Sequence, residues 1–132
     1  MRLNQASDFA LRIMMLLAED EKPLTVDEIA KRLNLVKSHV MKIVAKLVKA
    51  GFLNSQRGRS GGVSLGMAPQ HIVIGEVVQA IEADFAIVEC MQQGSCDCVF
   101  ARSCRLKGVI SDATAAFLDV LNARTLQSIL AK

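Results

Sequence analysis

The segment 25–65 constrains the fold of this chain most, because its capping and turn signals follow one another in a fixed order. Thr25 and Glu28 form a capping box, with a hydroxyl at the cap position and a carboxylate three residues on. A helix is therefore expected to begin here and to end near Leu33. Asn34 tolerates the left-handed backbone that a sharp corner requires. These signals predict a short helix followed at once by a tight turn.

A second helix is expected after the corner, from about residue 36 to residue 50, with Gly51 as its C-terminal cap. Its apolar stripe consists of Val40, Ile43, Val44, Leu47 and Val48. Polar and basic side chains lie off that stripe, namely Ser38, His39, Lys42, Lys46 and Lys49. Two short helices, a tight turn and a basic second helix predict a helix-turn-helix, although an isolated lysine-rich helix can also merely solvate one face.

Charge is divided unevenly along the chain. The segment 31–75 contains no Asp or Glu and eight basic residues, Lys31, Arg32, Lys37, Lys42, Lys46, Lys49, Arg57 and Arg59. The rest of the chain has eight basic and 13 acidic residues, so the net charge of +3 combines +8 in this segment with −5 elsewhere. This asymmetry predicts a surface that binds a polyanion, and it favours DNA binding over simple solvation of the helix.

A glycine-rich hairpin is expected directly after the basic helix, over residues 52–65. Its turn carries Arg57 and Arg59 and has three glycines within five residues, which permits a close reversal of the chain. Arginines at a hairpin tip suit the minor groove or the phosphates of DNA, so the hairpin is interpreted as a wing. A nucleotide-phosphate loop is disfavoured, because neither a Gly-Lys-Ser/Thr ending nor a helix start follows.

Helices are also expected outside this unit, over residues 4–18, 74–81 and 125–130. A longer helix is expected from about residue 104 to residue 121. Its apolar residues fall at helical spacing and are Leu106, Val109, Ile110, Ala113, Phe117, Val120 and Leu121. This stripe is either internal core or the seam of a dimer, and a regulator with two-fold symmetry needs a dimer.

Composition narrows the function classes. The 132 residues suffice for one domain with a modest core, or for a small domain plus an oligomerisation element. No segment reaches the ~18 apolar residues of a membrane span, and Asp8 and Arg12 argue against a signal peptide, so a cytoplasmic protein is expected. The absence of Trp and Tyr argues against a base-stacking platform. An enzyme is not expected, because no acid–base constellation is present and the only histidines are His39 and His71.

All four cysteines lie within 16 residues. Thiols packed this densely usually share a metal, an iron–sulfur cluster or a redox centre. Zinc is disfavoured because paired Cys-x2-Cys knuckles are absent. The spacing favours a labile iron–sulfur cluster on Cys90 and Cys104 with either Cys98 or Cys96. A cluster-free thiol sensor, in which Cys96 and Cys98 or their neighbours oxidise, is the alternative.

Motifs along nearly the whole chain resemble those of one family. They are Met1-Arg2-Leu3 with Asp8-Phe9-Ala10-Leu11-Arg12, Lys37-Ser38-His39-Val40-Met41-Lys42, Arg57-Gly58-Arg59-Ser60-Gly61-Gly62-Val63, and Ile87-Val88-Glu89-Cys90-Met91 with Ser103-Cys104-Arg105-Leu106. Taken together these motifs are specific. The chain resembles the winged-helix iron–sulfur transcriptional repressors of the NsrR, IscR and RirA types, and the resemblance is greatest for the nitric-oxide-sensing NsrR branch.

This resemblance implies that three cysteines hold the cluster, which is a 2Fe-2S or 4Fe-4S centre in the family. Five residues separate the family's last two cysteines, a spacing that matches Cys98 and Cys104 here. Cys90 is then the first ligand and Cys96 an extra thiol. The cluster-assembly branch has a histidine as fourth ligand at the position of Lys107, so that branch fits poorly.

The identity of the fourth ligand stays open. In some nitric-oxide sensors it resembles Asp8, donated by the first helix of the other subunit. An acid at this position is also what a helix dipole favours in a first turn, and Glu89 and Cys96 are rival ligands. The iron-responsive branch is similar around Phe85-Ala86 and in the longer gap between the first two cluster cysteines.

The sequence therefore predicts a mainly α protein with a small β wing. Residues 1–66 are expected to form a winged helix-turn-helix DNA-binding domain, and residues 67–132 the cluster-binding loop and dimerisation helix of one compact chain. The expected function is a homodimeric repressor that binds a palindromic operator in double-stranded DNA, with a DNA affinity that its cluster controls and nitric oxide as the signal. Iron- or redox-responsive regulation within the same family is the alternative. The DNA contacts are expected from Ser38, His39, Lys42, Lys46, Arg57 and Arg59.

Overall fold

The computed structural model describes residues 2–59 and 61–131; Met1 and Ser60, which belong to the motifs quoted above, lie outside the described residues. The elements in chain order are α1 (Gln5–Glu19), α2 (Val26–Leu33), α3 (Lys37–Lys49), β1 (Leu53–Gln56), β2 (Gly62–Leu65), the 3-10 turn η1 (Pro69–His71), α4 (Ile74–Ile81), the 3-10 turn η2 (Glu89–Met91), α5 (Arg105–Asn122) and α6 (Leu126–Ile129). The predicted class, mainly α with a two-stranded wing, is confirmed.

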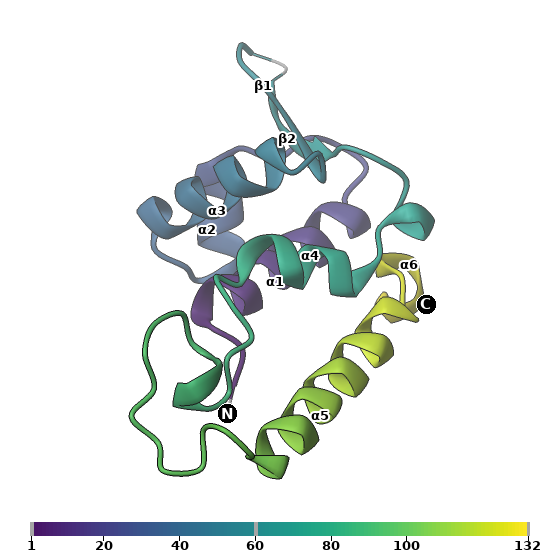
Figure 1. Cartoon of the computed structure of the whole chain (residues 1–132). Helices are drawn as coiled ribbons and strands as arrows, with labels where there is room; N and C mark the ends of the chain where they lie inside the picture. The colour runs from purple at the N-terminus through teal and green to yellow at the C-terminus, as the bar shows by residue number, and fades with distance from the viewer. Residues whose placement is uncertain (1, 60, 132) are drawn as a thin grey trace.

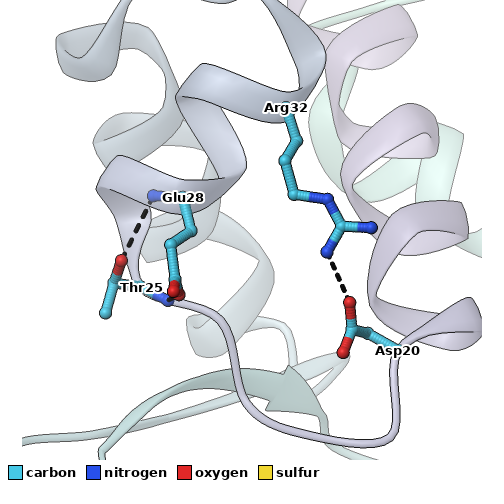
Figure 2. A network of polar contacts seen from close by, with 4 residues as sticks. All are labelled: Asp20, Thr25, Glu28 and Arg32. Carbon is cyan, nitrogen blue, oxygen red and sulfur yellow. Dashed lines mark hydrogen bonds and ion pairs between the residues drawn. The ribbon is translucent and has the colours of Figure 1, made fainter.

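The helix-turn-helix forms through the local signals that predicted it. Thr25 Oγ1 accepts a hydrogen bond from the Glu28 amide at 3.2 Å, and the Glu28 carboxylate accepts one from the Thr25 amide at 2.7 Å (Figure 2). Asn34 ends α2 in the left-handed conformation, with φ of 53°. The corner is therefore specified by residues next to one another in the chain, which is why the sequence predicted it.

The wing is a two-stranded antiparallel hairpin that projects beyond α2 and α3 (Figure 1). Leu53 pairs with Leu65 at its base and Gln56 with Gly62 near its tip. A third segment also joins it: Leu24 donates to the Val63 carbonyl at 3.0 Å and accepts from the Val63 amide at 2.7 Å. This pairing fastens the wing to the linker between α1 and α2 and so fixes its direction relative to α3.

One hydrophobic core joins α1, α2, α3 and the wing base to α4 and α6. Its largest fully buried side chains include Ile13, Met14, Ile29, Leu47, Leu53, Ile72 and Leu126. Backbone hydrogen bonds from Ile74 to Arg124 and from Leu126 to Ile72, 2.9 and 2.8 Å long, hold α6 beside the start of α4. The C-terminal half is thus anchored to the same core as the helix-turn-helix.

Helix α5 differs from the others because none of its residues is buried. The C-terminal end of α5 packs on α4, and the rest of α5 extends away from the body of the protein (Figure 1). Leu106 and Val109 are 62% and 63% exposed. The stripe on this helix is therefore not internal core in a single chain. Among the described residues, no helix is long and apolar enough to cross a membrane.

Candidate nucleic-acid interface and cysteine segment

The buried face of α3 fixes which side chains point outward. Its apolar residues Val40, Ile43, Val44 and Leu47 pack into the core. All four helix residues expected to contact DNA are exposed, namely Ser38, His39, Lys42 and Lys46. Because α3 packs against α1, α2 and α4, these side chains stand on a helix that the core holds in place. The exposed face can therefore enter a groove without rearrangement of the core.

This exposed face has a second contributor. His39, Lys42 and Lys46 line a shallow pocket of ≈ 210 Å³ together with Gln5 and Phe9 of α1. Gln5 was not expected there, because nothing in the local sequence indicates that the first turn of α1 lies beside the recognition helix. Another lysine of α3, Lys37, forms an exposed ion pair with Asp27 at 2.9 Å. Exposed pairs of this kind contribute little to stability.

Arg57 and Arg59 lie at the tip of the wing, and both are exposed. Gly58, between them, has a φ of 111°, a left-handed conformation that residues with a Cβ rarely adopt. The turn closes with a hydrogen bond from the Gly61 amide to the Gly58 carbonyl at 3.0 Å. The structure thus holds two guanidinium groups on a projecting turn, beyond the end of the recognition helix.

The four cysteines are all free thiols, and they occupy different settings. Cys90 lies in η2, Cys96 and Cys98 lie in irregular chain, and Cys104 is the cap residue of α5. Cys98 is exposed, whereas the other three are half-buried. The loop between η2 and α5 also exposes Val99 and Phe100, by 93% and 66%. Little apolar burial holds this segment in place.

Cys96, which the resemblance leaves as an extra thiol, lies near two of the expected ligands, Cys90 and Cys98. Partial desolvation raises the pKa of the Cys96 thiol, and the neighbouring Cys90 and Cys98 raise it further, as does the carboxylate of Glu89. Within residues 2–59 and 61–131, no three His, Cys, Asp or Glu side chains stand close enough together to hold a metal ion.

Asp8 lies in the first turn of α1 and is already paired. Its carboxylate accepts two hydrogen-bonding contacts from the Arg12 guanidinium, at 2.7 Å from Nη2 and 3.2 Å from Nε. Arg12 in turn lies over the ring of Phe9, at 5.9 Å from its centroid. The pair is about half exposed, so solvent competes with it. A ligand role for Asp8 would compete with Arg12 for the same carboxylate oxygens.

The donor set fits an iron–sulfur cluster by its chemistry. Four uncommitted thiols lie on a segment with few packing constraints, and such a segment can close around a group larger than one metal ion. Cys104 begins α5, whose first-turn amides have no side-chain cap and no acidic neighbour. The positive end of the helix dipole therefore favours an anionic ligand at this position.

A helix-turn-helix with a β wing and a basic outward face defines a winged-helix DNA-binding protein. The chain belongs to the Rrf2 family of iron-dependent transcriptional regulators, whose profile matches residues 3–132. It is 39% identical to the HTH-type transcriptional regulator NsrR of Bacillus licheniformis over 132 residues, covering 98% of this chain and 92% of that protein.

Two further proteins are similar to the chain over nearly its whole length. NsrR of Bacillus subtilis is 39% identical over 133 residues, covering 98% of this chain and 90% of that one. The structure of CymR, the global cysteine regulator of B. subtilis, superposes with a TM-score of 0.76 at 26% identity, covering 98% and 95% of the two chains. The chain is therefore a DNA-binding transcriptional regulator and not an enzyme, as the sequence predicted.

Proposed function

We propose that the chain is a homodimeric repressor whose DNA affinity depends on an iron–sulfur cluster held by Cys90, Cys98 and Cys104. The observation that supports this most is the pairing of a complete, rigid DNA-binding unit with a loosely packed segment that carries four free thiols. The similarity to transcriptional regulators named NsrR supports a regulator of this type, and the resemblance of the chain's motifs to the nitric-oxide-sensing branch favours nitric oxide as the signal. As a DNA-binding regulator, it would act in the cytoplasm.

The DNA-binding surface consists of α3 and the wing. Ser38, His39, Lys42 and Lys46 enter or flank the major groove, and Arg57 and Arg59 reach the backbone or the minor groove. A second copy of the chain, related by two-fold symmetry, presents the same surface to the other half of a palindromic operator. The stripe of α5 is the proposed seam between the two copies, because it is apolar and exposed in one chain.

The proposed ligand set extends across that seam. Three thiols come from one chain, and Asp8 of the partner subunit completes the set, in competition with its contact to Arg12. When bound, the cluster would supply the iron that reacts with nitric oxide. The segment from Cys90 to Cys104 leads directly into α5, so its conformation would influence the dimer seam and the spacing of the two copies of α3. A differential affinity of ~1–3 kcal/mol is enough for a working switch.

The test is an anaerobic titration that follows two signals in one sample. Reconstituted protein should absorb visible light and bind a double-stranded operator selected from random DNA, and nitric oxide should abolish both. Loss of colour with unchanged DNA affinity would contradict the proposed coupling. Loss of both signals on chelation of iron, without a response to nitric oxide, would favour an iron-responsive regulator of the same family.

A thiol sensor without a cluster is the second candidate, because Cys96 lies near Cys90 and Cys98 in a single chain and all are free. The same titration separates the two. A colourless protein that binds the operator tightly and releases it on addition of peroxide would support the thiol sensor and contradict the cluster.

A further inference from the structure

One apolar side chain on the outward face of α3 is more than half exposed. Met41 is 54% exposed, and Ala45, one turn further along, is exposed as well. A single exposed apolar residue usually needs no explanation. Met41, however, lies on the surface that the packing of α3 turns away from the core, among the side chains proposed to contact DNA. Its setting therefore differs from that of an ordinary exposed methionine such as Met67, which lies outside α3.

Helical spacing places Met41 at the centre of a small patch. Residues three and four apart are neighbours on a helix, so Ser38, Met41, Lys42 and Ala45 adjoin one another. The patch is thus apolar in the middle and polar or cationic at its edge. No acidic residue occurs between Lys31 and Gly75, which makes a polyanion the partner that the charge of this surface fits.

The major groove of DNA offers one apolar group on its base edges, the C5-methyl of thymine. A flexible methionine side chain can follow such a methyl group closely, and the small Ala45 leaves room for the base edge beside it. Lys42 can meanwhile reach a phosphate or an acceptor on a neighbouring base. We propose that Met41, next to Ala45, contacts a thymine methyl in the operator and makes A·T preferred over G·C at one position of each half-site.

This inference rests on the proposed entry of α3 into the major groove, and it adds a specificity determinant to it. The test uses a duplex selected by the full-length protein from random double-stranded DNA. Each thymine of the duplex is replaced in turn by uracil, which removes only the methyl group. Burying one such carbon is worth ~0.8 kcal/mol, so one uracil position should weaken binding of the unmodified protein about fourfold per half-site.

The variants Met41→Ala and Met41→Gln should bind thymine and uracil duplexes equally at that position, with an unchanged dependence on salt, because Met41 contacts no phosphate. Met67→Ala is the matched control and should keep the fourfold difference. Val36, which is 61% exposed at the start of α3, is the rival apolar contact. The proposal is overturned if no uracil position weakens binding, if both Met41 variants keep the difference, or if Val36→Ala alone removes it.

Failure of the underlying function would look different. If α3 does not enter DNA at all, Lys42→Ala and Lys46→Ala would leave both the affinity and its salt dependence unchanged. If α3 enters the groove but Met41 reads no base, these lysine variants would lower the salt slope by about one each while the uracil scan stays flat.

Discussion

Helices α3 and α5 carry apolar residues at the same helical spacing, yet they end in opposite environments. On α3, Val40 and Leu47 are fully buried. On α5, Leu106 and Val109 are more than 60% exposed. Periodicity thus gives each helix an apolar stripe, but it does not say whether the same chain provides the surface that covers it.

The difference lies in the neighbours. Helix α3 packs against α1, α2, α4 and β1, which surround its stripe. Helix α5 has its main contact with α4, near its own C-terminal end (Figure 1). Between α5, the segment 82–87 and the start of the chain lies an apolar hollow of ≈ 690 Å³, lined by Leu3, Phe85 and Phe117 among others. The side chains of α5 that face this hollow have few atoms to contact, so they gain little van der Waals stabilisation within one chain.

The DNA-binding unit is thus packed within one chain, whereas the stripe of α5 and the cysteine segment are largely uncovered in it. The DNA-binding unit has side-chain caps on α1 and α2, a buried core and an anchored wing. The C-terminal segment has free thiols, an exposed stripe and little burial. A switch is easier to build from the second kind of region, because its conformation costs little to change.

The largest expected effect concerns the thiols. Cys98→Ser should abolish the visible absorption of anaerobically reconstituted protein, because the cluster would lose a ligand, whereas Cys96→Ser should retain it. Circular dichroism should show the same helix content in both variants, since neither thiol is in the core. The opposite pattern, with colour lost in Cys96→Ser and kept in Cys98→Ser, would replace Cys98 by Cys96 in the ligand set.

The next largest effect is expected when one leucine on α3 and one on α5 are each replaced by alanine, which removes the same atoms from both helices. Leu47→Ala should lower the free energy of unfolding by ~2–5 kcal/mol, because it leaves a cavity in the core. Leu106→Ala, at an exposed position, should cost well under ~1 kcal/mol in dilute protein. Denaturant unfolding at several protein concentrations measures both. A cost of Leu106→Ala that grows with protein concentration would reveal a partner on α5, whereas equal costs at every concentration would remove the contrast.

A charge on the exposed stripe tests the second copy directly. Val109→Lys should weaken dimerisation on the order of 100-fold, since burying an unpaired ammonium costs ~3 kcal/mol or more. Ala115→Lys, at an exposed position on the opposite side of α5, is the matched control and should leave the dimer intact. Sedimentation at several concentrations distinguishes the two. A dimer that tolerates lysine at position 109 would show that this stripe is not the seam.

Local signals explain why so much of the fold could be predicted. The capping box of Thr25 and Glu28, the left-handed Asn34 and the glycines of the wing each act within a few residues. The pairing of Leu24 with Val63 was not foreseen, because it joins segments that only the packed core brings together. The docking of α6 beside α4 was missed for the same reason.

The candidate site also contains features that local sequence predicts and features that only the folded chain determines. Exposure of Lys42 and Lys46 follows from the spacing of α3, and the structure places both outward. Cysteine spacing, by contrast, gives the number of thiols but not which of them meet, so the neighbourhood of Cys96 and Cys90 could not be predicted. The pairing of Asp8 with Arg12 follows from helical spacing, whereas any role of Asp8 across a dimer stays a prediction.

The smallest expected effect lies on the DNA-binding half and depends on pH. A hydrogen bond from Arg32 holds the pKa of Asp20 below its ordinary value, with partial desolvation opposing it, and the pair joins the end of α1 to α2 (Figure 2). A carboxyl with a lowered folded-state pKa stabilises the fold above its unfolded pKa of about 3.9 and loses that contribution as the pH falls further.

The thermal midpoint of Arg32→Ala should therefore lie slightly below that of the unmodified protein near neutral pH and converge with it in acid. Arg32→Lys, which keeps the charge but not the planar fork, should fall between them. A difference that stays constant from about pH 6 to about pH 2 would mean that the pair contributes through packing rather than through the charge of Asp20.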